Sequence, residues 1–291
     1  AWVEASKTAM DAMKRFMDKD DAVRLLYASQ YSSIANYWKN RQGMIDALSA
    51  HKTADKKRKA EAKFAKWAKK AENKAEYGDV LNTLATYFEK TNTLSADQNY
   101  LGMLWRASFF IKMPTRYISL VSGAQRGGMP ADELDKKVDN LLSEYDKINL
   151  DVEKAILADM LKLYANKGTD VPTELKAIKA QYNGNFNKYV EDLLAKSIYR
   201  SKETAKEGAK QEAASLASDP ILQLSGVLFE SYRNPSPELF NLEDAYSKAY
   251  RKFVQGMRNS KASNILYPDA NSTMRLTYGS VDKLPFRKDR K

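Results

Sequence analysis

The sequence predicts an all-α fold of roughly ten helices. Proline, which ends or kinks helices, is absent from residues 1–113. The whole chain of 291 residues holds only 8 prolines and 12 glycines. Apolar residues, 43% of the chain, recur along most segments at intervals of three and four, which places them on one helix face. We therefore expect long helices around a substantial core, with no β-sheet within residues 1–260.

Polar breaks divide the proline-free part of the chain into helical segments. Residues 2–17 carry apolar side chains at helical spacing, Asp18–Asp21 interrupts the pattern, and residues 22–44 resume it. Residues 51–74, dense in lysine and alanine, are expected to form one long helix with a single buried stripe. Ser95-Ala-Asp-Gln98 has the form of a capping box, so we expect the next helix to begin there. The buried stripe of 51–74 consists of Ala60, Phe64, Trp67, Ala68 and Ala71.

Prolines and glycines divide the remainder. The helix that follows Ser95 contains Pro114, which should kink or divide it, and should end near Gly123. Residues 132–166 are expected to be helical with an interruption near Asn149. Further helices are expected from Pro172, Asn187, Pro220 and Ser236-Pro237, the last with Ser236 as its N-cap.

One strand is predicted near the C-terminus. Residues 273–278 alternate polar and apolar side chains, which places Met274, Leu276 and Tyr278 on one face. A single strand is not stable alone and needs neighbours to pair with. We therefore expect its sheet to lie in sequence outside this chain.

The composition excludes several kinds of chemistry. The chain has no cysteine, which rules out disulfides, thiol catalysis and thiolate metal sites. His51 is the only histidine and lies in a polar turn, so we expect a surface or capping residue and no Ser-His-Asp triad. No phosphate loop, metal motif or cofactor motif is present, and we expect no cofactor and no metal. No apolar run has the length of a membrane span, in agreement with a mean hydropathy of -0.60.

The net charge is +11, from 48 Lys and Arg against 37 Asp and Glu. A positive field of this size favours anionic partners, namely nucleic acid, acidic lipid surfaces or acidic peptides. Acidic residues are interspersed almost everywhere, so solvated helix faces are the simpler explanation. In the lysine-rich helix the apolar stripe serves packing and no aromatics interleave with the basic face. We therefore do not expect nucleic-acid binding.

The segment Asn36-Tyr-Trp-Lys-Asn40 is the one candidate binding site. Asn36 and Asn40 are four residues apart and share a helix face. Two amides on one face can hydrogen-bond an ammonium or a peptide backbone. They could equally cap neighbouring helices while Tyr37 and Trp38 pack in the core. The residues by themselves leave both interpretations open.

Two stretches resemble one known family. The first is Tyr27-Ala-Ser-Gln-Tyr31 leading into Ala35-Asn-Tyr-Trp-Lys-Asn40, with Gly43-Met44 following. The second is Tyr267-Pro-Asp-Ala-Asn-Ser-Thr-Met-Arg-Leu-Thr-Tyr-Gly279, in the expected order. Both resemble the bacterial dipeptidyl peptidases seven and eleven, which release dipeptides from free peptide N-termini.

The resemblance implies an architecture. Members carry a chymotrypsin-like double β-barrel with a Ser-His-Asp triad, and a large helical domain is inserted in that barrel. Residues 1–263 would be the inserted domain, and residues 264–291 would lead back to the barrel. The triad histidine and aspartate precede the insert and the serine follows it, so the resemblance assigns no catalytic residue to this chain and implies that it is inactive alone.

The resemblance also implies a binding role. In the family the helical domain covers the active-site cleft, and one of its asparagines binds the substrate's N-terminal ammonium. Here that residue would be Asn36 or Asn40, with Tyr37 and Trp38 lining the cleft or packing behind it. Residues 275–285 look more like the Asp/Glu-specific branch than the broader, hydrophobic-preferring branch. The expected partners are peptides with a free N-terminus, the barrel domain and a second copy of the enzyme.

The resemblance places the protein in the periplasm or at the cell surface. The alternative function from the sequence is a free-standing helical protein that binds an anionic partner.

Overall fold

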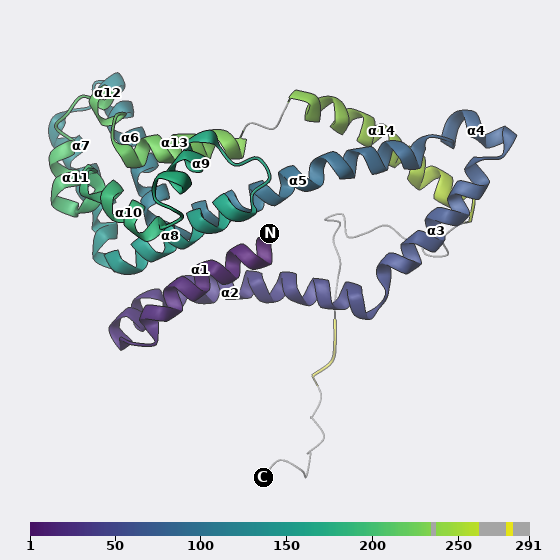
Figure 1. Cartoon of the computed structure of the whole chain (residues 1–291), viewed down its shortest axis with the longest axis horizontal. Coiled ribbons are helices and arrows are strands. Elements are labelled where there is room, and N and C mark those ends of the chain that lie inside the picture. Colours follow the sequence, from purple (N-terminus) through teal and green to yellow (C-terminus); the bar gives the residue numbers. More distant parts are fainter. Residues whose placement is uncertain (234–236, 262–277, 282–291) are drawn as a thin grey trace, which may run out of the picture.

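The computed structural model describes residues 1–233, 237–261 and 278–281 (Figure 1). These residues form fourteen α-helices and two short 3-10 helices and no strand, which confirms the predicted all-α fold. The number exceeds ten because short turns divide several of the expected helices. In chain order the helices are α1 (Trp2–Met17), α2 (Asp21–Ala50), α3 (Thr53–Ala68), α4 (Ala71–Tyr77), α5 (Val80–Ala107), α6 (Phe109–Gly127), α7 (Ala131–Leu142), η1 (Ser143–Lys147), α8 (Leu150–Lys167), α9 (Thr173–Gln181), α10 (Phe186–Ala195), η2 (Ile198–Arg200), α11 (Lys202–Gly208), α12 (Ala213–Leu216), α13 (Pro220–Arg233) and α14 (Pro237–Asn259).

The larger hydrophobic core lies in a bundle that fills the left half of Figure 1. Within it, α1 packs against α2, α5 and α8. The α1 side chains Ala5, Ala9 and Ala12 are fully buried, and their small size lets the neighbouring helices approach closely. Most apolar side chains of α8 are buried, in keeping with its central position.

A second, smaller core lies at the opposite end, where α5 extends beyond the bundle (Figure 1). Helix α14 lies along this part of α5, and α3 and α4 complete the cluster, which we call the tip. Gly256 lets α14 approach α3, because a Cβ atom there would clash with the ring of Phe64. The buried side chains of the tip are Phe64, Ala68, Tyr77, Val80, Leu84, Ala249 and Met257.

The break between α5 and α6 falls at Ser108, and Pro114 lies inside α6, so of the two predicted effects of Pro114, a kink or a division of the helix, the division does not occur. Ser108 has extended dihedrals, φ -87° and ψ 124°. The freed amide of Phe109 donates to a carboxylate oxygen of Glu153 at 2.9 Å. The buried acceptor on α8 therefore stabilises a break that no local signal at Ser108 announces.

Two other helix boundaries also differ from prediction. Helix α5 runs without interruption through Ser95, and the buried carboxylate of Asp97 instead accepts from the amides of Thr169 and Asp170 at 2.8 and 2.7 Å. Residues 51–74 form two helices, since α3 ends at Ala68 and α4 begins at Ala71, which is exposed. The turn between them is stabilised by Asn73, whose Nδ2 donates to the Trp67 carbonyl at 3.1 Å.

The predicted ends near Asn149 and Gly123 lie close to those observed. Asn149 is the N-cap of α8, and its side chain accepts from the amides of Asp151 and Val152. Helix α6 ends at Gly127, followed by Gly128 in the left-handed conformation. The predicted N-cap Ser236, the boundary at 263–264 and residues 273–277 of the predicted strand lie outside the described residues, while Tyr278 belongs to no helix or strand.

Candidate functional site

Helix α2 presents the candidate site, and it is buried only in its first part. It begins at the N-cap Asp20, whose carboxylate accepts from the amides of Ala22 and Val23. Val23, Tyr27 and Ile34 are its buried residues. Beyond Ile34 no residue of α2 is buried against the described part of the chain, so the second half projects from the bundle (Figure 1).

Asn36 and Asn40 lie at the start of this projecting half. Both side chains are exposed, and their four-residue separation places them on one side of the helix. Neither amide hydrogen-bonds to, or caps a helix of, the described residues. Their carbonyl and amino groups are therefore available to a ligand.

Tyr37 and Trp38 anchor the same turn of α2. The Tyr37 ring, 42% exposed, meets the Trp2 ring edge-on with centroids 6.3 Å apart. Trp38 is half-buried against the larger core. The indole nitrogens of Trp38 and Trp2 are both shielded from solvent and have no hydrogen-bond partner among the described residues. Tyr37 and Trp38 therefore take part in packing, as expected under the interpretation that these two side chains pack in the core.

Arg106 is a residue that the sequence did not point to. Its guanidinium lies 4.2 Å from the centroid of the Tyr37 ring, and its Nη2 donates to the Ser33 hydroxyl at 3.1 Å. Close by, Gln30 Nε2 donates to the Ala107 carbonyl at 2.9 Å. These contacts hold α2 against the end of α5. Arg106 is some seventy positions away in sequence, and no local pattern links it to α2.

A buried network fixes the base of α2. The Tyr27 hydroxyl donates to Glu153 Oε1 at 2.9 Å and accepts from the Asn149 amide at 3.0 Å. The other carboxylate oxygen accepts from the Phe109 amide, as described above. Burial raises the pKa of Glu153, and the hydrogen bonds from Phe109 and Tyr27 and the charge of Lys112 oppose that rise. Burial likewise raises the pKa of Tyr27, so the hydroxyl stays protonated and can donate.

The comparisons with known proteins show the family. The family described as Peptidase S46 matches residues 1–289. The chain belongs to the peptidase S46 family. This S46 chain is 54% identical over 292 residues to dipeptidyl-peptidase 7 of Capnocytophaga gingivalis. The aligned region covers 98% of this chain and 40% of that protein. The chain is 27% identical over 281 residues to the Asp/Glu-specific dipeptidyl-peptidase of the same organism, with 91% and 38% covered.

Solved structures share the fold of the S46 chain. The crystal structure of Porphyromonas endodontalis DPP11 matches with a TM-score of 0.68 and 23% identity, covering 93% of this chain and 39% of that one. The chain thus spans about 40% of the length of the relatives it matches. The resemblance to dipeptidyl peptidases seven and eleven is confirmed, and the helical fold is that of the matching part of the DPP11 structure.

A metal site or a membrane-spanning helix would be a further functional feature of the S46 chain. Across residues 1–233, 237–261 and 278–281, no three His, Cys, Asp or Glu side chains come together as metal ligands would. His51 lies exposed at the C-terminal end of α2. Every helix in the same part of the chain is either too short or too polar to serve as a membrane span.

Proposed function

We propose that this chain is the helical domain of a serine dipeptidyl peptidase and covers the active-site cleft of that enzyme. Its membership of the S46 family and its similarity to dipeptidyl peptidases support this function. Residues 1–263 form the covering domain and 264–291 lead back to the catalytic domain. The catalytic triad comes from that domain, so no residue of this chain has a catalytic role. A periplasmic or cell-surface location, and pairing of two copies, belong to the same proposal and rest on the family resemblance.

The observation that carries the proposal is the pair of exposed amides on the projecting half of α2, whose base is anchored in the bundle. Asn36 or Asn40 accepts a hydrogen bond from the substrate's N-terminal ammonium. An amide carbonyl suits this role, because it accepts from a cation without the desolvation cost of burying a carboxylate. Arg106 covers one face of Tyr37 with positive charge, so the ammonium does not bind on that ring face and Tyr37 serves as a wall.

The two branches of the family differ in the substrate residue before the cleaved bond. Residues 275–285 indicated the Asp/Glu-specific branch, but the identity is 54% to a dipeptidyl-peptidase 7 and 27% to an Asp/Glu-specific enzyme of the same organism. The higher identity favours the broader, hydrophobic-preferring branch, and we propose that specificity. The kcat/KM values for dipeptidyl substrates with Leu and with Glu at the second position distinguish the two branches. A higher kcat/KM for the Glu substrate would contradict the proposed preference and assign the enzyme to the Asp/Glu-specific branch.

Two substitutions in the full-length enzyme test the amide role. A hydrogen bond to a charged group contributes about 1.5–3 kcal/mol. Asn→Ala at the binding position should therefore lower kcat/KM on dipeptidyl substrates by roughly ten- to two-hundredfold, with helical content and Tm unchanged. The other asparagine is the matched control, since it lies on the same exposed face. Wild-type efficiency in both N36A and N40A would contradict the role of this segment.

A further inference from the structure

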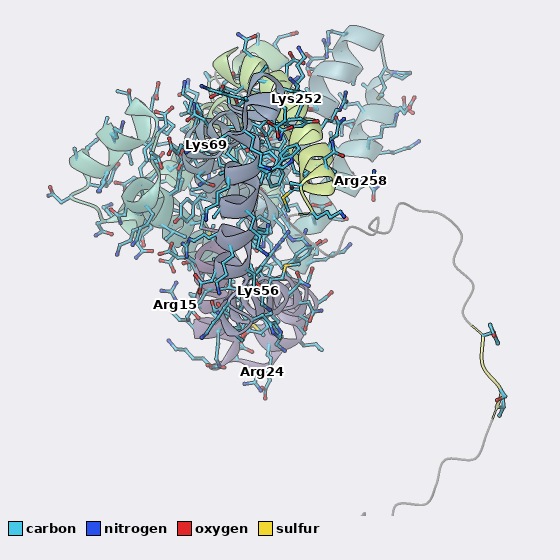
Figure 2. The ribbon with its side chains drawn as sticks, turned by 90° about the vertical axis from the view of Figure 1, so that its right-hand side faces the viewer. Arg15, Arg24, Lys56, Lys69, Lys252 and Arg258 are labelled. Carbon is cyan, nitrogen blue, oxygen red and sulfur yellow. The ribbon has the colours of Figure 1, made fainter. Side chains whose placement is uncertain are left out.

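The tip is much more basic than the rest of the molecule. Ten Lys and Arg residues but only three acidic residues lie between positions 52 and 74, which make up α3 and the start of α4. Helix α14 has four cations and three acidic residues, so it adds one net positive charge beside them. Figure 2, which faces this end, shows Lys56 and Lys69 along α3 and Lys252 and Arg258 on α14. The positive charge of the chain is therefore concentrated at one end.

Six lysines of this region follow one line. Their spacing alternates between four and three residues, which keeps the four within α3 on a single face of that helix, while the first precedes α3 and the last lies in the turn before α4. The line is helical only over these four, which span about 15 Å at 1.5 Å per residue. We call it the lysine row; it consists of Lys52, Lys56, Lys59, Lys63, Lys66 and Lys70.

The lysine row is not used within the described chain. All six side chains are exposed, and none forms an ion pair with a described residue. Among the described residues, the ion pair of α3 joins Arg58 to Asp55, neither of which belongs to the row. Like charges three or four residues apart destabilise a helix. The row therefore costs α3 stability and contributes nothing to the packing of the tip, where Phe64 and Ala68 make the contacts.

Exposed apolar side chains adjoin the start of the row. Met44, Ile45 and Leu48, on the last turns of α2, are 51%, 49% and 55% exposed. Leu48 and Lys52 line the same surface hollow at the corner between α2 and α3. Aliphatic side chains beside a line of cations are typical of surfaces that bind anionic lipid, where the charges meet phosphates and the apolar groups enter the interface.

The chemistry of the row favours lipid over nucleic acid. Its cations are all lysines, which act as point charges, and it contains no arginine fork for bidentate contacts. Nucleic-acid surfaces also offer aromatic rings on which bases stack. In the tip the rings of Trp67 and Tyr77 are 4.8 Å apart, and those of Phe64 and Phe253 are 5.1 Å apart, so they are engaged with one another. Tyr250, 49% exposed, lies on α14 and stacks on Tyr246.

We infer that the lysine row and the α2–α3 corner form a peripheral docking surface for a membrane of anionic phospholipid. The row lies along the headgroup phosphates and Leu48 enters the interface. This inference does not depend on the peptidase proposal, because it uses no residue of the candidate substrate site.

Co-sedimentation of the chain with vesicles tests the inference. The chain is expected to bind phosphatidylglycerol vesicles and not phosphatidylcholine vesicles, and to dissociate as salt rises from 50 to 300 mM. A triple variant, K56Q/K59Q/K63Q, should lower the apparent binding constant by roughly 30- to 100-fold. Glutamine keeps helix propensity, so circular dichroism should be unchanged. L48Q, which leaves the charge unchanged, should lower binding by roughly three- to tenfold.

The matched control removes three exposed lysines from the other end of the molecule. Lys147, Lys162 and Lys176 form no ion pair with described residues and lie in or beside α8 and α9. K147Q/K162Q/K176Q changes net charge equally and should lower binding less than about threefold. Equal losses in the two triple variants would overturn the inference, as would failure of the wild type to bind at 50 mM salt or an unchanged L48Q. Tighter binding to a DNA duplex than to the vesicles would assign the row to nucleic acid and also overturn it.

Discussion

Glu153 offers the clearest test of how the bundle holds α2. Its carboxylate is 1% exposed and accepts from the Phe109 amide and the Tyr27 hydroxyl, each at 2.9 Å. Alanine at this position leaves the Phe109 amide without an acceptor, whereas Tyr27 keeps the Asn149 carbonyl at 3.3 Å. One orphaned buried donor and the space left by the side chain should together cost about 2–4 kcal/mol. E153A should therefore lower Tm by about 4–10 °C.

Glutamine is the informative second substitution. Its carbonyl can accept from Phe109 while its amino group donates to Tyr27, whose hydroxyl turns to Asn149. E153Q keeps the volume and the hydrogen bonds and removes the charge that burial disfavours. We expect its stability at neutral pH to lie within about 1 kcal/mol of wild type.

The pH dependence has a definite sign. The folded-state pKa of Glu153 is raised above its ordinary value of 4.5. The folded state thus holds the proton more tightly than the unfolded state. The stability contributed by the protonated group is complete below pH 4.5 and is lost as the pH rises through the folded-state pKa. Wild type should therefore lose stability relative to E153Q from about pH 4.5 upward.

Thermal unfolding followed by circular dichroism between pH 4.5 and 8 measures this difference. The other carboxylates are shared by the two proteins, so their contributions cancel. A Tm difference that stays constant with pH, or that moves in favour of wild type as pH rises, would refute the assignment of a raised pKa to Glu153. A Tm for E153A equal to that of E153Q would refute the role of the Phe109 hydrogen bond.

Two further substitutions probe other contacts. Arg106→Ala in the full-length enzyme should lower kcat/KM several-fold, because Tyr37 and Ser33 of α2 lose their contacts to α5. The Tm should change by less than about 2 °C, since the Arg106 side chain is exposed. Unchanged kcat/KM would show that Arg106 does not orient α2. Gly256→Ala should destabilise the tip by about 1–3 kcal/mol, seen as faster hydrogen exchange in α14, because the new Cβ meets the Phe64 ring. Gly43→Ala, where no atom lies within 4 Å, is its control and should be neutral or stabilising.

The candidate site could be predicted only in part. The motif around Asn36 and Asn40 indicated the right helix, and the four-residue spacing placed both amides on one face. Whether those amides cap a neighbouring helix or face solvent depends on which elements pack against α2. The residue spacing gives no information about those neighbours. Arg106 reaches Tyr37 only because α5 returns past α2 after passing through the tip. A contact between such distant residues leaves no trace in either local pattern.

The sequence by itself determined the helical class and many helix ends. Apolar periodicity and the scarcity of proline set the class. Asp20, Asn149 and Asn185 cap helices through their own side chains, which bond to amides two or three residues ahead. Signals of this range act within one turn, so the neighbouring sequence is sufficient to predict them.

The tertiary structure decided where the long helices break. α5 runs through the apparent capping box at Ser95, and two residues later the Asp97 carboxylate accepts from the amides of Thr169 and Asp170, which ties α5 to the segment after α8. The chain leaves the helix at Ser108 because Glu153 on another helix accepts the amide that the break exposes. A buried amide needs an acceptor from any part of the chain, and the fold alone fixes which residue supplies it.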